Sequence, residues 1–162
     1  MTIKKFSVAV LLFVVSVCYG CASGSITGAT KPTVDLGTFK TVAVTVKSVG
    51  DVKDEERSEL KDDIVKCLQE DGKWIPAERG DLTINVTVTE MSRVSAAARL
   101  LSGVFAGKAK CKADISLIDA KGAVVSSFSV EGQSGGTGLS GGTGTAIRDV
   151  ARLIAEYFKT AK

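Results

Sequence analysis

The chain has 162 residues, a formal net charge of +3, 44% hydrophobic residues, four cysteines and no histidine. This length provides for one domain, and the apolar content is too high for a disordered chain. A charge of +3 is too small to indicate a nucleic-acid-binding protein. The missing histidine excludes Ser-His-Asp and Cys-His catalysis and histidine-ligated zinc. We therefore expect no enzyme, no bound cofactor and no metal site.

Residues 1–20 have the pattern of a secretory signal peptide. Lys4 and Lys5 precede a mostly apolar run over residues 6–17. A membrane-spanning helix needs about 20 apolar residues, so this run has the length of a signal-peptide core. Removal of the signal peptide takes away both lysines and leaves 19 basic and 18 acidic residues in the remaining chain.

The residues that follow resemble the box of bacterial lipoproteins. In that pattern a small residue precedes a cysteine that is acylated and becomes the first residue after cleavage. Gly20 and Cys21 match these two positions. Cys18 and Tyr19 depart from the usual residues of the box. We expect lipidation at Cys21, and two or more acyl chains hold a protein stably to a bilayer. By the same resemblance, Ala22 after the cysteine favours the outer membrane. Ordinary secretion with cleavage after Ala22 and an uncleaved anchor are the alternatives.

Residues 21–38 are expected to form a flexible tether, because their small and polar residues show no apolar periodicity. The folded domain is then residues 39–162. Alternation of apolar and polar residues predicts half-buried strands, and an apolar stripe every three to four residues predicts helices. The predicted elements are a strand at 41–47, a helix at 53–71, a short strand at 74–77, three strands at 82–89, 110–117 and 124–131, and a helix at 146–160. Pro76 indicates a sheet edge, and Thr145 is the expected N-cap of the last helix.

This order predicts an α/β (α+β) two-layer sandwich, with a mixed sheet of about four to five strands and two helices on one face. The turn at residues 119–122 joins the last two strands as a hairpin. The polar positions of the long strands are Thr, Asn, Ser, Lys and Glu, so the second sheet face is expected to stay uncovered. That face is either a docking surface or an ordinary solvated sheet face.

One segment carries a family resemblance. Residues 99–110, then a strand, the turn at 119–122, another strand and a glycine-rich stretch before the last helix resemble the bacterial lipoprotein family called domain of unknown function 4410. The resemblance covers about residues 39–160 and is sharpest over 93–133. It implies a periplasm-facing lipoprotein with a small α/β domain, similar in layout to the N-terminal domain of TolB and to envelope assembly lipoproteins. It implies no catalytic residues.

The glycine-rich loop over residues 132–144 repeats Ser-Gly-Gly-Thr-Gly twice before the last helix. Such a loop at a helix N-terminus can bind an anion through backbone N–H groups, and a flexible connector is the other interpretation. Ser134 and Ser140 match the letters of a nucleophile elbow, but the chain has no histidine to act as their base.

A basic segment lies between residues 91 and 113. It holds Arg93, Arg99, Lys108, Lys110 and Lys112 and no acid, so a local charge of +5 lies within a nearly neutral chain. The last four are candidate docking residues for anionic lipids or an acidic partner. The alternative is that the lysines form the solvated outer row of a strand.

Cys67 and Cys111 are both expected on inward faces, one on the first helix and one on a strand. Either they form a disulfide, or they pack as two small apolar thiols. For the whole chain we expect a lipid-anchored, non-enzymatic accessory or assembly factor of the cell envelope. Its partners would be the membrane and another envelope protein, and not nucleic acid. The alternative is a periplasmic module that binds a small ligand or anion with the loop at residues 132–144.

Overall fold

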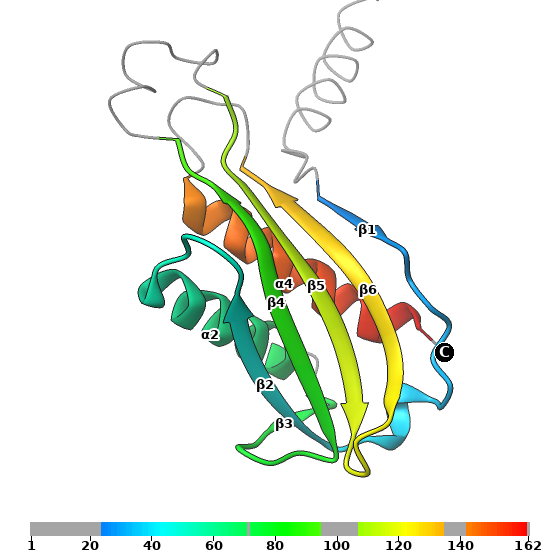
Figure 1. Cartoon of the computed structure of the whole chain (residues 1–162). Coiled ribbons are helices and arrows are strands. Elements are labelled where there is room, and N and C mark those ends of the chain that lie inside the picture. The colour runs from blue at the N-terminus through cyan, green and yellow to red at the C-terminus, as the bar shows by residue number, and fades with distance from the viewer. Residues whose placement is uncertain (1–23, 71, 95–106, 135–141, 162) are drawn as a thin grey trace, which may run out of the picture.

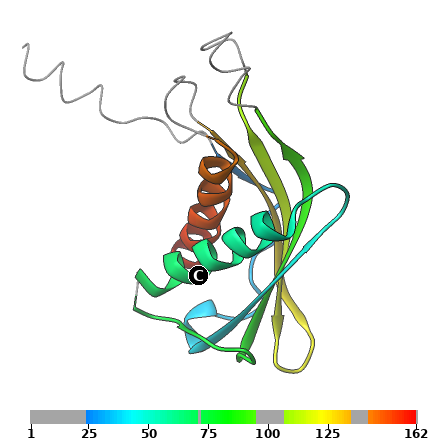
Figure 2. The same ribbon diagram turned by 90° about the vertical axis from the view of Figure 1, so that its left-hand side faces the viewer.

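The computed structural model describes residues 24–70, 72–94, 107–134 and 142–161, which form one mixed sheet with two α-helices on one face (Figures 1 and 2). The elements are β1 (Ser25–Thr27), the 3-10 turn η1 (Leu36–Thr38), β2 (Thr41–Ser48), α2 (Asp54–Glu70), β3 (Ile75–Pro76), β4 (Leu82–Ser92), β5 (Lys110–Asp119), β6 (Val124–Gln133) and α4 (Thr143–Thr160). The predicted α/β two-layer arrangement is confirmed. The sheet has six strands because residues ahead of position 39 add β1.

The strand order is β1-β6-β5-β4-β2-β3. The neighbours β1-β6, β6-β5 and β5-β4 are antiparallel, and a short turn joins β5 to β6. β2 is parallel to both β4 and β3. β3 lies at one edge, in agreement with the prediction from Pro76. The start of β1, the ends of β4 and β6 and the start of β5 meet at one end of the sheet, which is the upper end in Figure 1.

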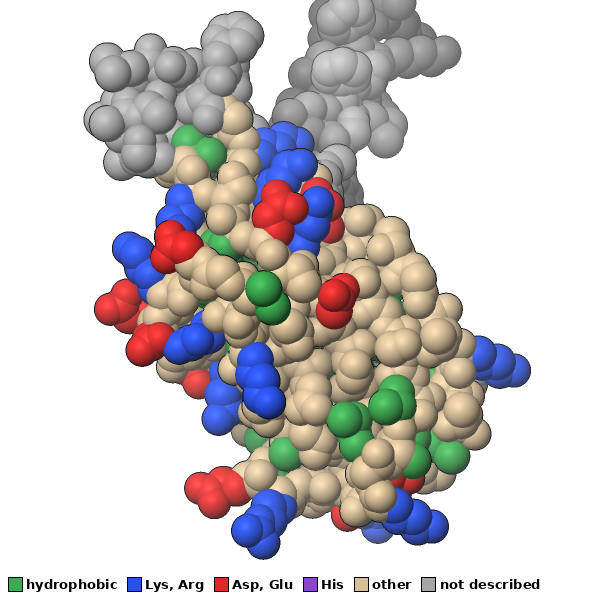
Figure 3. Space-filling model, viewed as in Figure 1, with side chains coloured by type: hydrophobic (Ala, Val, Ile, Leu, Met, Phe, Trp, Pro, Cys, Tyr) green, Lys and Arg blue, Asp and Glu red, His purple; other side chains and the backbone are tan. Residues whose placement is uncertain are grey.

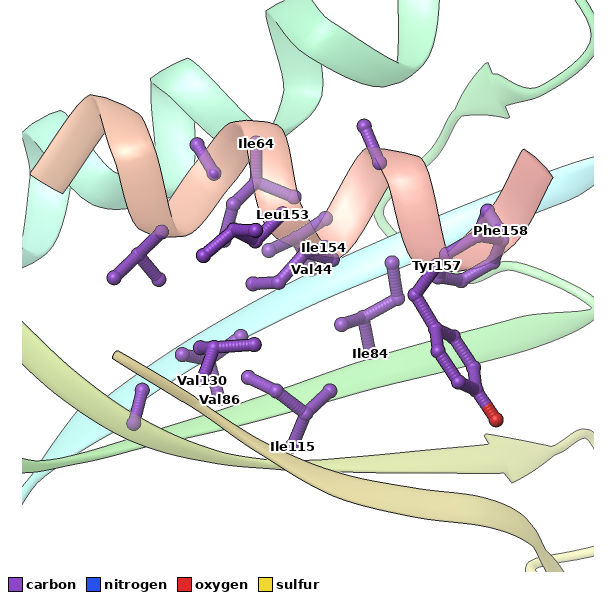
Figure 4. Packing of buried hydrophobic residues seen from close by; sticks show 14 of the residues in the cluster. Val44, Ile64, Ile84, Val86, Ile115, Val130, Leu153, Ile154, Tyr157 and Phe158 are labelled. Carbon is purple, nitrogen blue, oxygen red and sulfur yellow. The ribbon is translucent and has the colours of Figure 1, made fainter. Parts of the chain in front are cut away.

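The core lies between the sheet and the two helices. Side chains from β2, β4, β5 and β6 point toward α4, which places its apolar stripe over the middle of the sheet (Figure 4). Ile84, Ile115, Ile64 and Ile154 are at most 1% exposed. Burying one such side chain stabilises the fold by about 1.5–3 kcal/mol, so this layer supplies most of the driving force for folding.

The two helices begin differently. In α2, the Glu56 carboxylate accepts a hydrogen bond from the backbone N–H of Lys53 at 3.0 Å, and three acidic residues occupy the first turn. Both features satisfy the positive N-terminal end of a helix. In α4 the N-cap is Gly142, which has no side chain to accept a bond. The expected cap at Thr145 is wrong, because the helix starts earlier and Thr145 lies inside its first turn.

Residues 24–38 differ from the flexible tether that we expected. Ser25, Ile26 and Thr27 pair with β6, and the backbone N–H groups of Thr30 and Thr33 continue this pairing to the carbonyl oxygens of Ser127 and Val125, each at 2.9 Å. The segment therefore adds a strand to the sheet.

Side chains hold the same segment. The side chain of Leu36 is completely buried. The Tyr157 hydroxyl on α4 lies 2.9 Å from the carbonyl oxygen of Thr30, to which it donates, and 2.6 Å from the Ser126 hydroxyl. The sequence signal for this added strand was weak, because its contacts depend on single residues rather than on a periodic pattern. The expected signal peptide and Cys21 lie outside the described residues. Neither described helix is long and apolar enough to cross a bilayer.

Candidate interaction surface on the open sheet face

The face of the sheet opposite the helices is uncovered by any described element (Figure 2). Its side chains are the polar positions of the alternating strands, and in the space-filling view they give a surface with few hydrophobic side chains at its centre (Figure 3). Thr83, Asn85, Thr87, Ser116 and Ser129 are all half-buried on this face. The sequence therefore predicted the open face and its composition correctly.

A hollow of about 290 Å³ lies on this face between β1, β6, β5 and β4. Thr27, Lys112, Ser129 and Glu131 are among the residues that line it. The Ser129 hydroxyl donates to the Asp114 carboxylate at 2.6 Å, which fixes one wall. The hollow can therefore offer hydroxyl groups and both signs of charge to a partner.

The two lysines of β5 on this surface, Lys110 and Lys112, are paired with acids from the neighbouring strands. The Lys112 ammonium lies 3.0 Å from Glu90 on β4 and 3.5 Å from Glu131 on β6, and Lys110 lies 3.6 Å from Glu131. The hydrogen bond to Glu90 raises the pKa of Lys112. The hydrogen bond from Gln133, together with the nearby lysines, lowers the pKa of the Glu131 carboxyl.

Arg93 is paired as well, and its partners lie at the start of α2. Its guanidinium makes two hydrogen bonds to the Glu56 carboxylate, at 2.6 and 2.7 Å, and also contacts the Asp51 carboxylate and carbonyl oxygen. The hydrogen bond with Glu56 raises the pKa of Arg93 and lowers the pKa of Glu56. Arg93 therefore joins the end of β4 to the loop before α2.

The basic segment is thus not a surface of +5. Arg93, Lys110 and Lys112 face acids from other elements that lie 19 or more residues away in the sequence. A count of charges along the segment therefore misses these acids. Such solvent-screened pairs add little to stability, but they cancel much of the local charge. Lys108 is exposed, and Arg99 lies outside the described residues.

The two cysteines among the described residues, Cys67 and Cys111, are free in the structure. Cys111 is close enough to Glu56, in the first turn of α2, for that charge to help raise its pKa. Cys67 follows Glu56 by 11 residues on the same helix, a rise of about 16 Å, whereas a disulfide needs Cα atoms within about 7 Å. In this structure the two thiols are therefore separate side chains, with no disulfide between them.

Most of the glycine-rich loop, residues 135–141, lies outside the described residues, and Ser140 is among them. Ser134 is completely buried, and its hydroxyl accepts a hydrogen bond from the backbone N–H of Ala109 at 2.9 Å. The backbone N–H of Ser134 also donates to the Ala109 carbonyl oxygen at 2.8 Å, and this bond extends the pairing of β5 and β6 by one residue pair. Among the described residues, no three His, Cys, Asp or Glu side chains gather as metal ligands would.

Asp149 on α4 is a buried acid that the sequence did not single out. It is 4% exposed, one carboxylate oxygen bonds to Arg152 at 2.7 Å, and the other has no partner among the described residues. The glycine at position 24 packs directly on it, since a Cβ there would lie 2.4 Å from the unpaired oxygen. A lone acid on an apolar helix stripe is the only sequence signal for this contact.

The fold and the sequence were compared with known proteins. No curated protein matches the chain. Two solved structures share the fold: a PelC variant dodecamer and a PelC dodecamer, both from Paraburkholderia phytofirmans. They have TM-scores of 0.60 and 0.59 and identities of 15% and 16%, and each alignment covers 86% of this chain and 99% of the other. The model of the domain of unknown function DUF4410 matches residues 34–138, more than half of the chain. The chain therefore belongs to the DUF4410 family, as its sequence resemblance indicated.

Proposed function

We propose that the chain is a lipid-anchored protein of the bacterial cell envelope, held at the outer membrane facing the periplasm, and that it acts without catalysis by binding proteins. Its partners include further copies of itself and another envelope protein. The signal-peptide pattern, the Gly20-Cys21 pair and membership of the DUF4410 family support the anchor. The fold shared with a protein that forms dodecamers supports self-association.

The observation that carries the proposal is the position of β1. This strand begins at Ser25, only four residues after Cys21, and it is paired with β6. Four extended residues span at most about 14 Å. An acylated Cys21 would therefore keep the upper end of the sheet against the bilayer, whereas a tether reaching to residue 38 would let the domain reach about 60 Å away.

This arrangement would also orient the molecule. The turn between β5 and β6 lies at the opposite end of the sheet, about 30 Å away along the ten residues of β6. The open sheet face would then be roughly perpendicular to the membrane plane, so that a neighbouring protein at the same membrane could reach its hollow and paired charges. A surface in that position is suited to contacts between neighbouring anchored proteins.

The anchor is tested by fractionation of cells that express Cys21→Ser, with Cys18→Ser as the matched control. We expect Cys21→Ser to leave the membrane fraction and Cys18→Ser to remain in it. A cleaved Cys21→Ser protein that stays on the membrane would contradict lipid anchoring.

Protein binding is tested by photocrosslinking in intact cells. A photoreactive residue at Thr87, on the open face, is compared with one at Lys66, on the exposed side of α2. We expect Thr87 to give crosslinks to a second copy or to an envelope protein. Crosslinks of equal yield from both positions, or none from Thr87, would remove the open face as the docking surface.

A further inference from the structure

The edge of β2 is mostly uncovered. β3 pairs only with Thr41 and Val42. The backbone N–H groups of Ile75 and of Ala77, just after β3, donate to the carbonyl oxygens of Lys40 and Val42. Because successive residues of a strand direct their N–H and C=O groups to alternate sides, Val44 and Val46 direct theirs to this same edge, beyond the end of β3. β4 occupies the other side of β2 as far as Ser48.

The edge groups of Val44 and Val46 have no backbone partner in the described part of the chain. A row of unpaired N–H and C=O groups on a sheet edge is a template for another strand. In this fold, β1 extends the sheet on the far side and β3 shields two residues, so residues 44–46 are the part of β2 that is left for such pairing.

Two adjoining hollows run along this edge, between β2 and α2. One has a volume of about 400 Å³ and the other about 250 Å³, and Val44, Thr45 and Lys61 line both. Val65 adds apolar surface to the larger hollow. The side chains of an added strand alternate in direction, so every second one would enter this groove.

The charge of the groove selects the kind of strand. Lys61 is exposed and makes no ion pair with a described residue, although it lines both hollows. Arg57 closes the upper end, where it bonds to the Ser48 hydroxyl at 3.2 Å and pairs with Asp54. One acid, Glu78, lies at the lower end. The middle of the groove is therefore basic.

A second copy of the chain fits this edge poorly. Twofold pairing of β2 with β2 would bring Lys61 toward its own copy, and like charges repel. The other exposed sheet edge, over residues 25–33, contains Lys31 and no acid. We propose that the free edge of β2 binds an extended, acidic segment of a different protein by strand addition, with Lys61 contacting its acidic side chain.

The test uses the full chain, purified from membranes in detergent, and two eight-residue peptides with acetylated and amidated ends, (Val-Glu)4 and (Val-Lys)4. Hydrogen exchange of single backbone amides is followed by NMR with and without peptide. We expect (Val-Glu)4 to slow exchange of the Val44 and Val46 amides and (Val-Lys)4 to leave it unchanged. Lys61→Glu should weaken binding of (Val-Glu)4 about fivefold. Lys66→Glu, with the same charge change on α2 away from the groove, should not weaken it.

Several results would overturn the proposal. These are unprotected Val44 and Val46 amides at millimolar (Val-Glu)4, equal binding of both peptides, and equal effects of the two lysine variants. Protection that grows with protein concentration in the absence of peptide would assign the edge to a second copy instead. The outcome is independent of Cys21 lipidation, so failure here leaves the proposed anchor intact.

Discussion

Gly132 on β6 is the point at which the sheet touches the backbone of α4. A Cβ at this position would lie 2.3 Å from the Ala146 carbonyl oxygen and 2.9 Å from the backbone nitrogen of Val150. Real Cβ contacts are almost never shorter than 3.0 Å, so Gly132→Ala would push the helix and strand apart by roughly 0.7 Å. The helix cannot move freely, because Ile147, Val150 and Ile154 are completely buried.

The size of the effect follows from this contact. Adding a methyl group to a packed core costs about 1–3 kcal/mol, and a clash with backbone atoms belongs at the upper end of that range. We expect Gly132→Ala to lower the free energy of unfolding by about 3 kcal/mol. For a domain of this size, that is a fall in Tm of about 10 °C.

Gly144 provides the matched control. A Cβ there would meet the tip of the Glu59 side chain at 2.8 Å, and that side chain can rotate away. Since alanine is favoured over glycine inside a helix by about 0.5–1 kcal/mol, Gly144→Ala should be neutral or stabilising. Both variants are compared by urea denaturation followed by circular dichroism. A loss below about 1 kcal/mol for Gly132→Ala would refute the close packing of α4 on β6.

Three further predictions concern the N-terminal segment, the thiols and the acid response. Leu36→Ala should lower the free energy of unfolding, measured by urea denaturation, by about 2–5 kcal/mol, as for a core leucine. A change within 0.5 kcal/mol would instead indicate that residues 24–38 form a flexible tether. Burial raises the pKa of the Cys111 thiol to about 12 and also raises the pKa of Cys67. Iodoacetamide at pH 8 should therefore leave Cys111 unmodified in the folded protein and react slowly at Cys67. Rapid loss of both thiols, measured by mass spectrometry, would contradict this prediction. Arg93 lowers the pKa of Glu56 in the folded state, so the stabilisation from this pair is present above the unfolded pKa of about 4.3 and is lost as the pH falls through the folded pKa. Arg93→Met should therefore make the free energy of unfolding less dependent on pH below about 5. An unchanged pH profile would exclude the Arg93–Glu56 pair as a source of this dependence.

The sequence predicted the elements whose burial is periodic. The alternation of Leu82, Ile84, Val86 and Val88 defined β4, and these four side chains are at most 1% exposed. The stripe from Ile147 to Phe158 defined α4 in the same way. In these segments the apolar residues repeat at a regular spacing, so the local sequence is sufficient to predict the element and its buried side.

The contacts that the sequence did not predict depend on partners far along the chain. β1 has only three residues, and its place in the sheet rests on β6 and on the bond between Tyr157 and Thr30. The charge of the basic segment is offset by Glu56, Glu90 and Glu131, which come from other elements. Contacts between elements that are far apart in the chain decide both features, and no local pattern encodes them.

The central claim is that a short connection from Cys21 holds the upper end of the sheet at the bilayer. It is tested most directly with single fluorophores on cysteines introduced at Lys108, near the upper end, and at Lys121, in the turn at the opposite end. The background carries Cys67→Ala, and the buried Cys111 is retained.

The full chain, purified from membranes, is placed in liposomes that contain a lipid with a quencher on its headgroup. The account predicts strong quenching of the label at position 108 and little at position 121. Equal quenching at the two positions would contradict it.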